Sequence, residues 1–502
     1  MLARAYRGLS YQARQLQRET TIAVRFNRGG VSSGKNHGFS VDRSGLLGGG
    51  KDMKELLNSQ TLKESQEALW RLENGLGGAD DNEDKTPPYI PPPNKEEMTV
   101  LAADLQTYIG VRGPISIQDY MLQCSNHFVH GYYQTSASKI GAGGDFVTAP
   151  EMSQLFGEMI GMWCLSHWMS LGKPKKISIC EMGPGKGTLM KDILNVATKF
   201  PPFQAALQVH LVELSDNMRK QQRAALGCAD DAATAAAAMA AQQPLHSTTF
   251  NVPVYWHHAL QQVPQDENVP ILAIGQEFLD AFPVHQFEFR NGEWKEKLVD
   301  ICKSPENDYH FRYVLSPSAT PAVRALISAV SGRGEGEEAV KHAEREAMEI
   351  SPLALATCEA IGARICRSGG AALLIDYGEN YTQGDSLRGF RKHQLVSALS
   401  NPGMTDVTVD VDFSACARAA AKRGAVAIGA IPQGEFLIRM GVVDRVQQLL
   451  ALKTTTDEDA LKMLSSLRRL VDAGDMGKRF KVLAILDPRR EINTIGFPEV
   501  TL

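Results

Sequence analysis

Strand-like and helical segments alternate along this chain from about residue 176 onward. The strand-like runs are KISICEM (176–182), QVHLVEL (208–214), VPILAIGQEF (269–278) and GGAALLIDYG (369–378). Amphipathic helical patterns at 188–200 and 216–226 follow the first two runs. This alternation predicts an α/β fold with a parallel, Rossmann-like sheet and helices on both faces.

Each of the four strand-like runs carries an acidic residue at its end. These residues are Glu181, Glu213, Glu277 and Asp376. Because ligands of open parallel sheets bind beyond the carboxyl ends of the strands, we expect the four side chains to surround one site.

The loop EMGPGKG (181–187) after the first strand matches one of three known glycine patterns. A P-loop needs a different spacing, and the dinucleotide pattern GxGxxG would place glycine where Thr188 stands, although variants exist. The third pattern, E/D-x-G-x-G-x-G, is typical of S-adenosylmethionine-dependent methyltransferases, and it matches at every defined position. The alternative is a tight turn without a ligand.

The chemistry of S-adenosylmethionine also suits this loop, since the molecule has no phosphate. Gly183, Gly185 and Gly187 would allow close backbone approach, and N–H groups at the helix start would meet the ligand carboxylate. Glu181 would bind the cationic end, and Glu213 would accept hydrogen bonds from the ribose hydroxyls. NAD would use Glu213 equally, but Glu181 would repel a pyrophosphate.

Composition and charge narrow the class of protein. The chain has 502 residues and a net charge of −4, so no overall basic field indicates nucleic-acid binding. No apolar run approaches the roughly 18 residues that a membrane span requires. The eight cysteines form no CxxC pair. We therefore expect neither a zinc site nor a disulfide framework, and no bound metal.

The first 30 residues contain six arginines and a single acid, Glu19. This pattern is typical of a mitochondrial transit peptide, with a disordered basic tail as the alternative. We expect a leader at 1–40 and an acidic, proline-rich linker at 41–95. A helical N-terminal cap is expected at 96–172, and its first helix is expected to end at Gly110.

The remaining chain, 173–490, is expected to form the methyltransferase core, with insertions near 227–249 and 325–350. Before this core, Thr148 and Glu151 suit a capping box at the start of a helix. Gly157 and Gly161 lie one turn apart on this helix and would let another element pack closely.

Several stretches together resemble the MidA-type methyltransferases, which include a mitochondrial complex I assembly factor that dimethylates an arginine. The stretches are GGDFVTAPEMSQLFGEMIGMW, CEMGPGKGTLMKDIL, QEFLDAFPVHQFEF, DYGENYTQGDSLRGFRKH, DVTVDVDF and QGEFLIRMG. The resemblance covers about residues 98–490. It departs from the family in the two insertions and in Gln276, where Asn or His is expected.

The resemblance implies a class I methyltransferase fold and S-adenosyl-L-methionine as cofactor. It also implies a mitochondrial matrix location and, as partner, a core subunit of the complex I matrix arm that is methylated on arginine. The glycine-rich turn KIGAGGDF would close over the cofactor, with contacts from Gly144, Asp145, Thr148 and Gln154.

Arginine is a difficult methyl acceptor because its guanidinium group stays protonated, and carboxylates can pair with it and orient it. In GQEFLDAFPVH (275–285), Glu277 is the candidate guanidinium clamp, and Asp280 and His285 are candidate further catalytic residues. Structural alternatives are a helix N-cap for Glu277, a surface acid for Asp280 and a buried strand histidine for His285.

Other residues are open to two interpretations. Asp376 could orient Tyr377 or the acceptor, and Arg388 and His393 could hold the acceptor backbone or form surface salt bridges. Two other functions also remain open. They are a cofactor-binding assembly chaperone without essential catalysis, and a nucleotide-dependent oxidoreductase.

Overall fold

The computed structural model describes residues 23–25, 40–42, 96–135, 147–229, 231–304, 307–327, 346–489 and 494–499. The chain divides into two compact units, Met1–Tyr89 with Gly441–Gly477, and Ile90–Met440 with Lys478–Leu502. In the first unit, β1 (Ala23–Arg25) pairs with β2 (Ser40–Asp42), and two helices are α18 (Val442–Leu450) and α19 (Asp457–Val471). Apart from β1 and β2, the expected leader and linker lie outside the described residues.

A nine-stranded sheet forms the centre of the second unit, in the order β18-β19-β13-β8-β4-β5-β7-β6, with β17 beside β13. Its strands are β4 (Ile177–Met182), β5 (Leu207–Val212), β6 (Leu245–Ser247), β7 (Val252–His257), β8 (Ile271–Gln276), β13 (Gly370–Glu379), β17 (Val411–Asp412), β18 (Val426–Pro432) and β19 (Phe480–Leu486). The four strands expected from the sequence, β4, β5, β8 and β13, run parallel to one another, whereas β19 pairs with β13 in the antiparallel direction. In the sheet, β5 lies on one side of β4 and β8 lies on the other side. Because the strand order reverses at β4, a crevice is expected between the carboxyl ends of β4 and β8.

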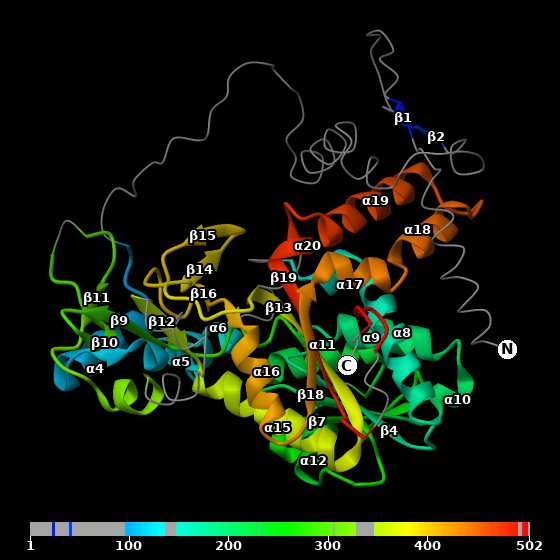
Figure 1. The fold of residues 1–502 in the computed structure, drawn as a ribbon, viewed down its shortest axis with the longest axis horizontal. Coiled ribbons are helices and arrows are strands. Elements are labelled where there is room, and N and C mark those ends of the chain that lie inside the picture. Colours follow the sequence, from blue (N-terminus) through cyan, green and yellow to red (C-terminus); the bar gives the residue numbers. More distant parts are fainter. Residues whose placement is uncertain are drawn as a thin grey trace. The chain divides into compact units, whose positions relative to one another are not determined.

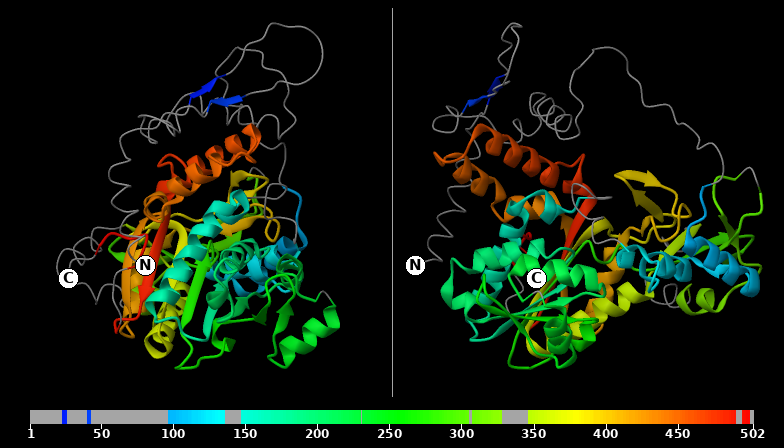
Figure 2. Two further views of the ribbon diagram at one scale, coloured as in Figure 1. Left: turned by 90° about the vertical axis from the view of Figure 1, so that its right-hand side faces the viewer. Right: turned by 180° about the vertical axis from the view of Figure 1, so that it is seen from behind.

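Helices cover both faces of this sheet (Figures 1 and 2). Because side chains alternate along a strand, Cys180 and Met182 of β4 lie on one face, in a core cluster with α15 (Pro352–Ser368) and α16 (Phe413–Ala421). The other face is covered by α8 (Gln154–Ser170), α9 (Thr188–Ala197) and α11 (Asp216–Leu226). The class I methyltransferase architecture expected from the sequence is confirmed.

Two glycines of α8 allow α9 to pack closely against it, as the sequence predicted. A Cβ atom at Gly157 would lie 2.4 Å from the Cβ of Asp192. One at Gly161 would lie 2.9 Å from the Cβ of Val196. The two helices therefore approach each other at a distance that larger side chains would prevent.

Four of the five strands of a second sheet, β9 to β12, lie between β8 and β13 in the sequence. Its order is β11-β10-β9-β12, with β3 on β10, and its strands are β3 (Ile115–Ser116), β9 (His285–Arg290), β10 (Glu293–Ile301), β11 (Phe311–Leu315) and β12 (Ala347–Ile350). The helices α4 (Val100–Arg112) and α5 (Ile117–Asn126) pack on it in one apolar cluster (Figure 1). The N-terminal helices thus build a core of their own with this sheet.

The shorter elements complete the description. A three-stranded sheet contains β14 (Arg388–Arg391), β15 (Gln394–Val396) and β16 (Asp406–Thr408). The short helices are α6 (Tyr132–Thr135), α7 (Ala149–Met152), α10 (Pro201–Gln204), α17 (Gln433–Arg439) and α20 (Met476–Arg479). The stretch expected as the first insertion contains α12 (Ala232–Ala240) and the edge strand β6, and residues 328–345 of the second lie outside the described residues. Among the described helices, none combines the length and apolar character that a bilayer crossing requires.

Two local predictions were wrong. Helix α4 continues past Gly110 to Arg112 and ends at Gly113, whose φ of +85° suits glycine. Thr148 is the N-cap residue of α7, but its side chain makes no capping hydrogen bond, so the expected capping box is absent. Ser153, in an extended conformation, separates α7 from α8 and provides the side-chain cap of α8. The Glu151 carboxylate accepts a hydrogen bond from the Thr188 hydroxyl, so it joins α7 to α9.

Candidate cofactor and acceptor site

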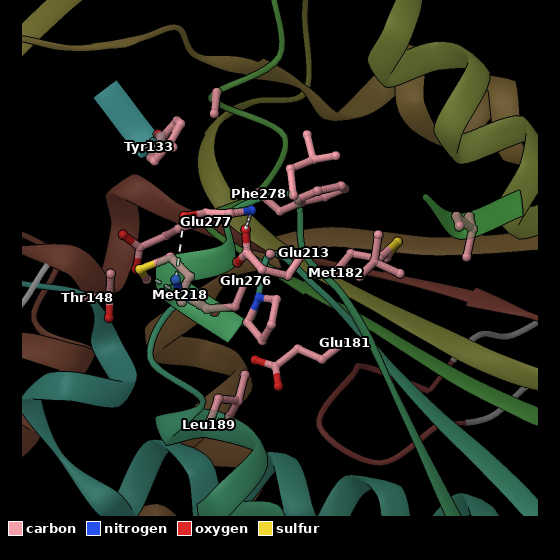
Figure 3. Close-up of a pocket in the computed structure, with 18 of the residues that line it drawn as sticks. Tyr133, Thr148, Glu181, Met182, Leu189, Glu213, Met218, Gln276, Glu277 and Phe278 are labelled. Atoms are coloured by element: carbon pink, nitrogen blue, oxygen red, sulfur yellow. Dashed lines mark hydrogen bonds between the residues drawn. The ribbon is translucent and has the colours of Figure 1, made fainter. Parts of the chain in front are cut away.

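A cavity of about 350 Å³ lies at the carboxyl ends of β4, β5 and β8. In Figure 3, Glu181 lies in the lower part of this cavity, Glu277 in the upper part, and Tyr133 and Thr148 along one side. The cavity therefore occupies the edge of the sheet where the acidic strand ends indicated a ligand. Glu181, Glu213 and Glu277 line it as expected, but Asp376 does not.

The glycine loop forms one wall of the cavity and needs its glycines. Gly183, Gly185 and Gly187 have φ values of +66°, +52° and +86°, which other residues rarely adopt. A Cβ atom at Gly183 would also lie 3.0 Å from the ring of Phe278. Gly183 and Gly185 line the cavity, whereas Gly187 starts α9 and packs against Gln222 of α11.

Glu181 is a buried carboxylate at the bottom of the cavity. Its side chain is 2% exposed, and burial raises its pKa to about 8. Within the described part of the chain, its Oε2 atom has no hydrogen-bond partner. Because an unpaired buried polar group costs free energy, this atom indicates a ligand that carries a donor or a positive charge.

Glu213 is held by two partners at the end of β5. Its Oε1 accepts from the backbone N–H of Ser215 at 2.8 Å, and its Oε2 accepts from the Gln222 side chain at 3.1 Å. The same Gln222 nitrogen donates to the carbonyl oxygen of Gly185 at 2.7 Å, and Trp256 donates to the Gln222 oxygen at 2.9 Å. One side chain of α11 therefore joins the glycine loop to the second acidic position.

Sequence reasoning missed Gln222. A signal was present, since Met218, Gln222 and Leu226 are spaced four residues apart and form the buried stripe of α11. A glutamine within such a stripe needs buried partners, which here are Glu213 and the glycine loop.

Of the other expected cofactor contacts, two belong to the described part of the chain. Thr148 lines the cavity, whereas Gln154 faces a neighbouring hollow that shares Pro150, Lys186 and Thr188 with it. Gly144 and Asp145 lie outside the described residues, as does the rest of the glycine-rich turn.

Glu277 lines the cavity directly after β8 and has a φ of +48°. Its Oε1 accepts from the side chain of Gln276 at 2.8 Å and from the backbone N–H of Ala149 at 3.3 Å. Burial, and next the charge of Asp280, raise the pKa of Glu277 to about 8. The N-cap interpretation is wrong, because the chain continues in a turn and not in a helix.

Asp280 and His285 do not line the cavity. The Asp280 carboxylate is buried and accepts a hydrogen bond from the hydroxyl of Tyr377, and burial raises its pKa to about 6. His285 begins β9, where its Nδ1 lies 2.6 Å from Oε1 of Glu296 and its ring stacks on Phe287. The structure thus brings Asp280 close behind Glu277 and places His285 in the second sheet.

Arg388 and His393 also lie apart from the cavity lining. Arg388 forms an ion pair with Asp410 at 2.7 Å, and its guanidinium carbon lies 4.8 Å from the centre of the Tyr377 ring. His393 is exposed in the turn between β14 and β15. Among the described residues, no group of three or more His, Cys, Asp or Glu side chains is arranged to hold a metal ion.

Comparisons with known proteins agree with this geometry. Residues 159–431 match the sequence profile of a family described as putative S-adenosyl-L-methionine-dependent methyltransferase. The mitochondrial protein arginine methyltransferase NDUFAF7 of Danio rerio is 34% identical over 396 residues, which cover 77% of this chain and 86% of that protein. The Homo sapiens protein of the same name is 35% identical over 405 residues, 79% of this chain and 86% of its own.

A crystal structure of a candidate methyl transferase from Burkholderia thailandensis, bound to S-adenosyl-homocysteine, has the same fold. It is 26% identical, with a TM-score of 0.60 over 80% of this chain and 92% of that one. The glycine loop and the unpaired Glu181 oxygen fit such a cofactor, since they offer close backbone approach and a carboxylate for its ammonium group.

These findings decide against the oxidoreductase alternative, and the names of the relatives confirm the mitochondrial location expected from the N-terminus. The chain belongs to the NDUFAF7 family of methyltransferases, and its cofactor is S-adenosyl-L-methionine.

Proposed function

We propose that this protein methylates an arginine side chain in a core subunit of the matrix arm of respiratory complex I, in the mitochondrial matrix, and that complex I assembly needs this step. The observation that carries the proposal is Glu277, a buried carboxylate that lines the cavity. In the described ranges, no ion pair involves it, so it is available to a cationic acceptor. The relatives named protein arginine methyltransferases support the same acceptor.

The lower part of the cavity would hold the cofactor, which supplies a methyl group from its sulfonium when bound. In the proposal, Glu181 binds the ammonium group and Glu213 accepts from the ribose hydroxyls. Gly183 and Gly185 offer their backbone to the amino-acid tail, and Gly187 with Thr188 begins the helix whose N–H groups face the ligand carboxylate. Thr148 and, from the adjoining hollow, Gln154 are proposed as further contacts.

Glu277 would bind and orient the acceptor at the upper end of the cavity. Its carboxylate can accept two N–H bonds from a guanidinium group, each worth about 1.5–3 kcal/mol. Such pairing draws positive charge towards one edge of the group and leaves one nitrogen facing the methyl donor. Asp280 contributes negative charge from behind the same turn, through its position next to Glu277.

Glu277 also suits the proton that the reaction releases. Methylation would form a bond between the methyl carbon and an arginine nitrogen, while the carbon–sulfur bond of the donor would break and release S-adenosyl-homocysteine, and the nitrogen would lose one proton. Burial raises the pKa of Glu277 to about 8 in the empty cavity, so a bound guanidinium group would displace the carboxyl proton, and the charged carboxylate could then take up the proton that the reaction releases.

The substitution Glu277→Gln tests the proposal, because it keeps the shape of the side chain but removes its charge. We expect S-adenosyl-homocysteine to bind within about threefold of wild type by calorimetry, and methyl transfer to fall about 100-fold or more. Glu349→Gln is the matched control, since Glu349 is also buried but belongs to β12 in the second sheet.

The same experiment distinguishes a catalytic role from the remaining alternative, a cofactor-binding assembly chaperone. If Glu277→Gln transfers methyl groups at the wild-type rate, the proposed acceptor site is wrong. If the variant loses transfer but still supports complex I assembly fully, the protein acts as a cofactor-binding chaperone and not through catalysis.

A further inference from the structure

The carboxylate of Asp376 lies inside the turn that follows β8. Its Oδ2 accepts hydrogen bonds from three consecutive backbone N–H groups, those of Phe278, Leu279 and Asp280, at 3.0, 2.9 and 3.2 Å. Its Oδ1 accepts from the backbone N–H of Tyr377 at 2.9 Å. Asp376 is 1% exposed, so the turn is folded around a buried carboxylate from the neighbouring strand β13.

Tyr377, the next residue of β13, holds the far end of the same turn. Its hydroxyl donates to Oδ2 of Asp280. The backbone carbonyl of Asp280 accepts from Val409 at 3.1 Å, which fixes this residue from a second side. The Tyr377 ring is itself held between Arg388, at 4.8 Å, and the edge of Phe480, at 5.5 Å between ring centres.

The turn needs such support because Glu277 adopts a backbone conformation that is unfavourable for its residue type. A φ of +48° in a residue other than glycine is unfavourable and persists only where surrounding contacts hold it. The backbone N–H of Glu277 still pairs with Ile375 at 2.9 Å, so the ladder between β8 and β13 ends at this residue. Asp376 and Tyr377 hold the chain immediately after it.

We propose that Asp376 and Tyr377 are positioning residues for the acceptor, which fix the turn Glu277–Asp280 so that the Glu277 carboxylate faces the cavity. The identity of the acceptor rests on the proposed function, whereas the positioning rests on the hydrogen bonds of this turn. Neither Asp376 nor Tyr377 lines the cavity, so they act through Glu277.

Loss of this support should affect the acceptor more than the cofactor. Glu181 belongs to β4, and the Glu213 carboxylate is fixed by hydrogen bonds from Ser215 and Gln222. Among the described residues, no side-chain hydrogen bond joins either carboxylate to β13. The contact that links the turn to the glycine loop is the Phe278 ring beside Gly183. A small displacement of Glu277 would therefore misalign the guanidinium group and leave most cofactor contacts in place.

Two substitutions test this inference. Asp376→Asn keeps the size of the side chain, but whichever way the amide is turned, its NH₂ group faces a backbone N–H. Tyr377→Phe removes only the bond to Asp280. The matched controls are Asp487→Asn, a buried acid at the opposite edge of the sheet, and Tyr120→Phe, whose buried hydroxyl donates to Ala398 in the second core.

The measurements are steady-state methyl transfer to the acceptor subunit, with kcat and KM resolved, and calorimetry with S-adenosyl-homocysteine. For Asp376→Asn and Tyr377→Phe we expect kcat to fall by about 10–100-fold, because misplacement of about 1 Å can have this effect. Cofactor affinity should stay within about threefold, and both controls should keep wild-type kcat and KM. A purely structural role would lower the thermal midpoint without this separation of kcat from cofactor affinity.

The inference is overturned if the Tyr377→Phe variant folds and has the kcat and KM of the wild-type protein. If the Asp376→Asn variant does not fold, the Tyr377→Phe variant alone decides the question. It is also overturned if cofactor affinity falls as far as transfer does. If the wild-type protein methylates a side chain other than arginine, the proposed function fails, but the same variants still test positioning on that side chain.

Discussion

The side-chain amide of Gln222 donates both to the Glu213 carboxylate, at 3.1 Å, and to the Gly185 carbonyl, at 2.7 Å. A single residue of α11 thus fixes the distance between the glycine loop and the acid at the end of β5. The two groups proposed to meet the amino-acid tail and the ribose of the cofactor depend on one side chain.

The substitution Gln222→Met should therefore weaken cofactor binding. It fills a similar volume but removes the hydrogen bonds to Glu213 and Gly185 and the one that Trp256 donates. The Glu213 carboxylate and the Trp256 N–H group then each lack one partner, at a cost of about 1–3 kcal/mol for each unpaired group. We expect the dissociation constant for S-adenosyl-homocysteine to rise roughly tenfold or more by calorimetry. Gln221→Met at the preceding, half-buried position is the control, and equal effects of the two variants would contradict this role of Gln222.

Glu181→Gln should stabilise the empty protein while it weakens the cofactor site. Burial raises the pKa of Glu181 from 4.5 to about 8, so the folded state binds its proton more tightly than the unfolded state does. The stability that the protonated Glu181 side chain contributes is fully present below its pKa in the unfolded state. It is lost as the pH rises through its pKa in the folded state. Glutamine stays neutral throughout, so the variant should melt roughly 2–4 °C higher than wild type at pH 8.

The same comparison near pH 5 should show little difference between the two melting points, since Glu181 is then protonated in the folded state. Thermal melts of the cofactor-free proteins at both pH values check the prediction. Glu158→Gln, on the exposed side of α8, is the control. A lower melting point for Glu181→Gln at pH 8 would mean that this carboxylate is satisfied in the empty cavity.

Gly157→Ala should destabilise the protein without a direct effect on either ligand. The added Cβ would lie 2.4 Å from the Cβ of Asp192, so α8 and α9 would have to move apart. Overpacking of this kind costs typically about 1–3 kcal/mol. Urea unfolding should give a lower midpoint than wild type. Gly110→Ala is the control, because Gly110 also lies within a helix, α4, and its Cβ would meet only Cδ1 of Ile301, at 4.0 Å.

The parts of the fold that could be predicted depend on patterns of residues that are close together in the sequence. The strands β4, β5, β8 and β13 are short apolar runs bounded by polar residues, and the glycine spacing of 183, 185 and 187 is readable without tertiary information. The acidic strand ends follow from the same reasoning, because parallel strands bring their carboxyl ends to one edge.

The parts that could not be predicted depend on contacts between distant segments. Asp376 and the turn it holds are about 100 residues apart, and nothing local indicates that this acid accepts from backbone N–H groups. His285 shares its motif with Glu277, yet the start of β9 carries it into the second sheet and towards Glu296. The pattern of a capping box at Thr148 is also local, but the structure does not form it. The Glu151 side chain pairs instead with Thr188, which is distant in the sequence.

The most direct test of the account is mass spectrometry of complex I matrix-arm subunits, incubated with the purified protein and S-adenosylmethionine that carries an isotopically heavy methyl group. The account predicts the heavy methyl on a guanidinium nitrogen of one subunit with the wild-type protein, and its loss with Glu277→Gln. Heavy methyl on another type of side chain, or on none while the cofactor site is saturated, would contradict it.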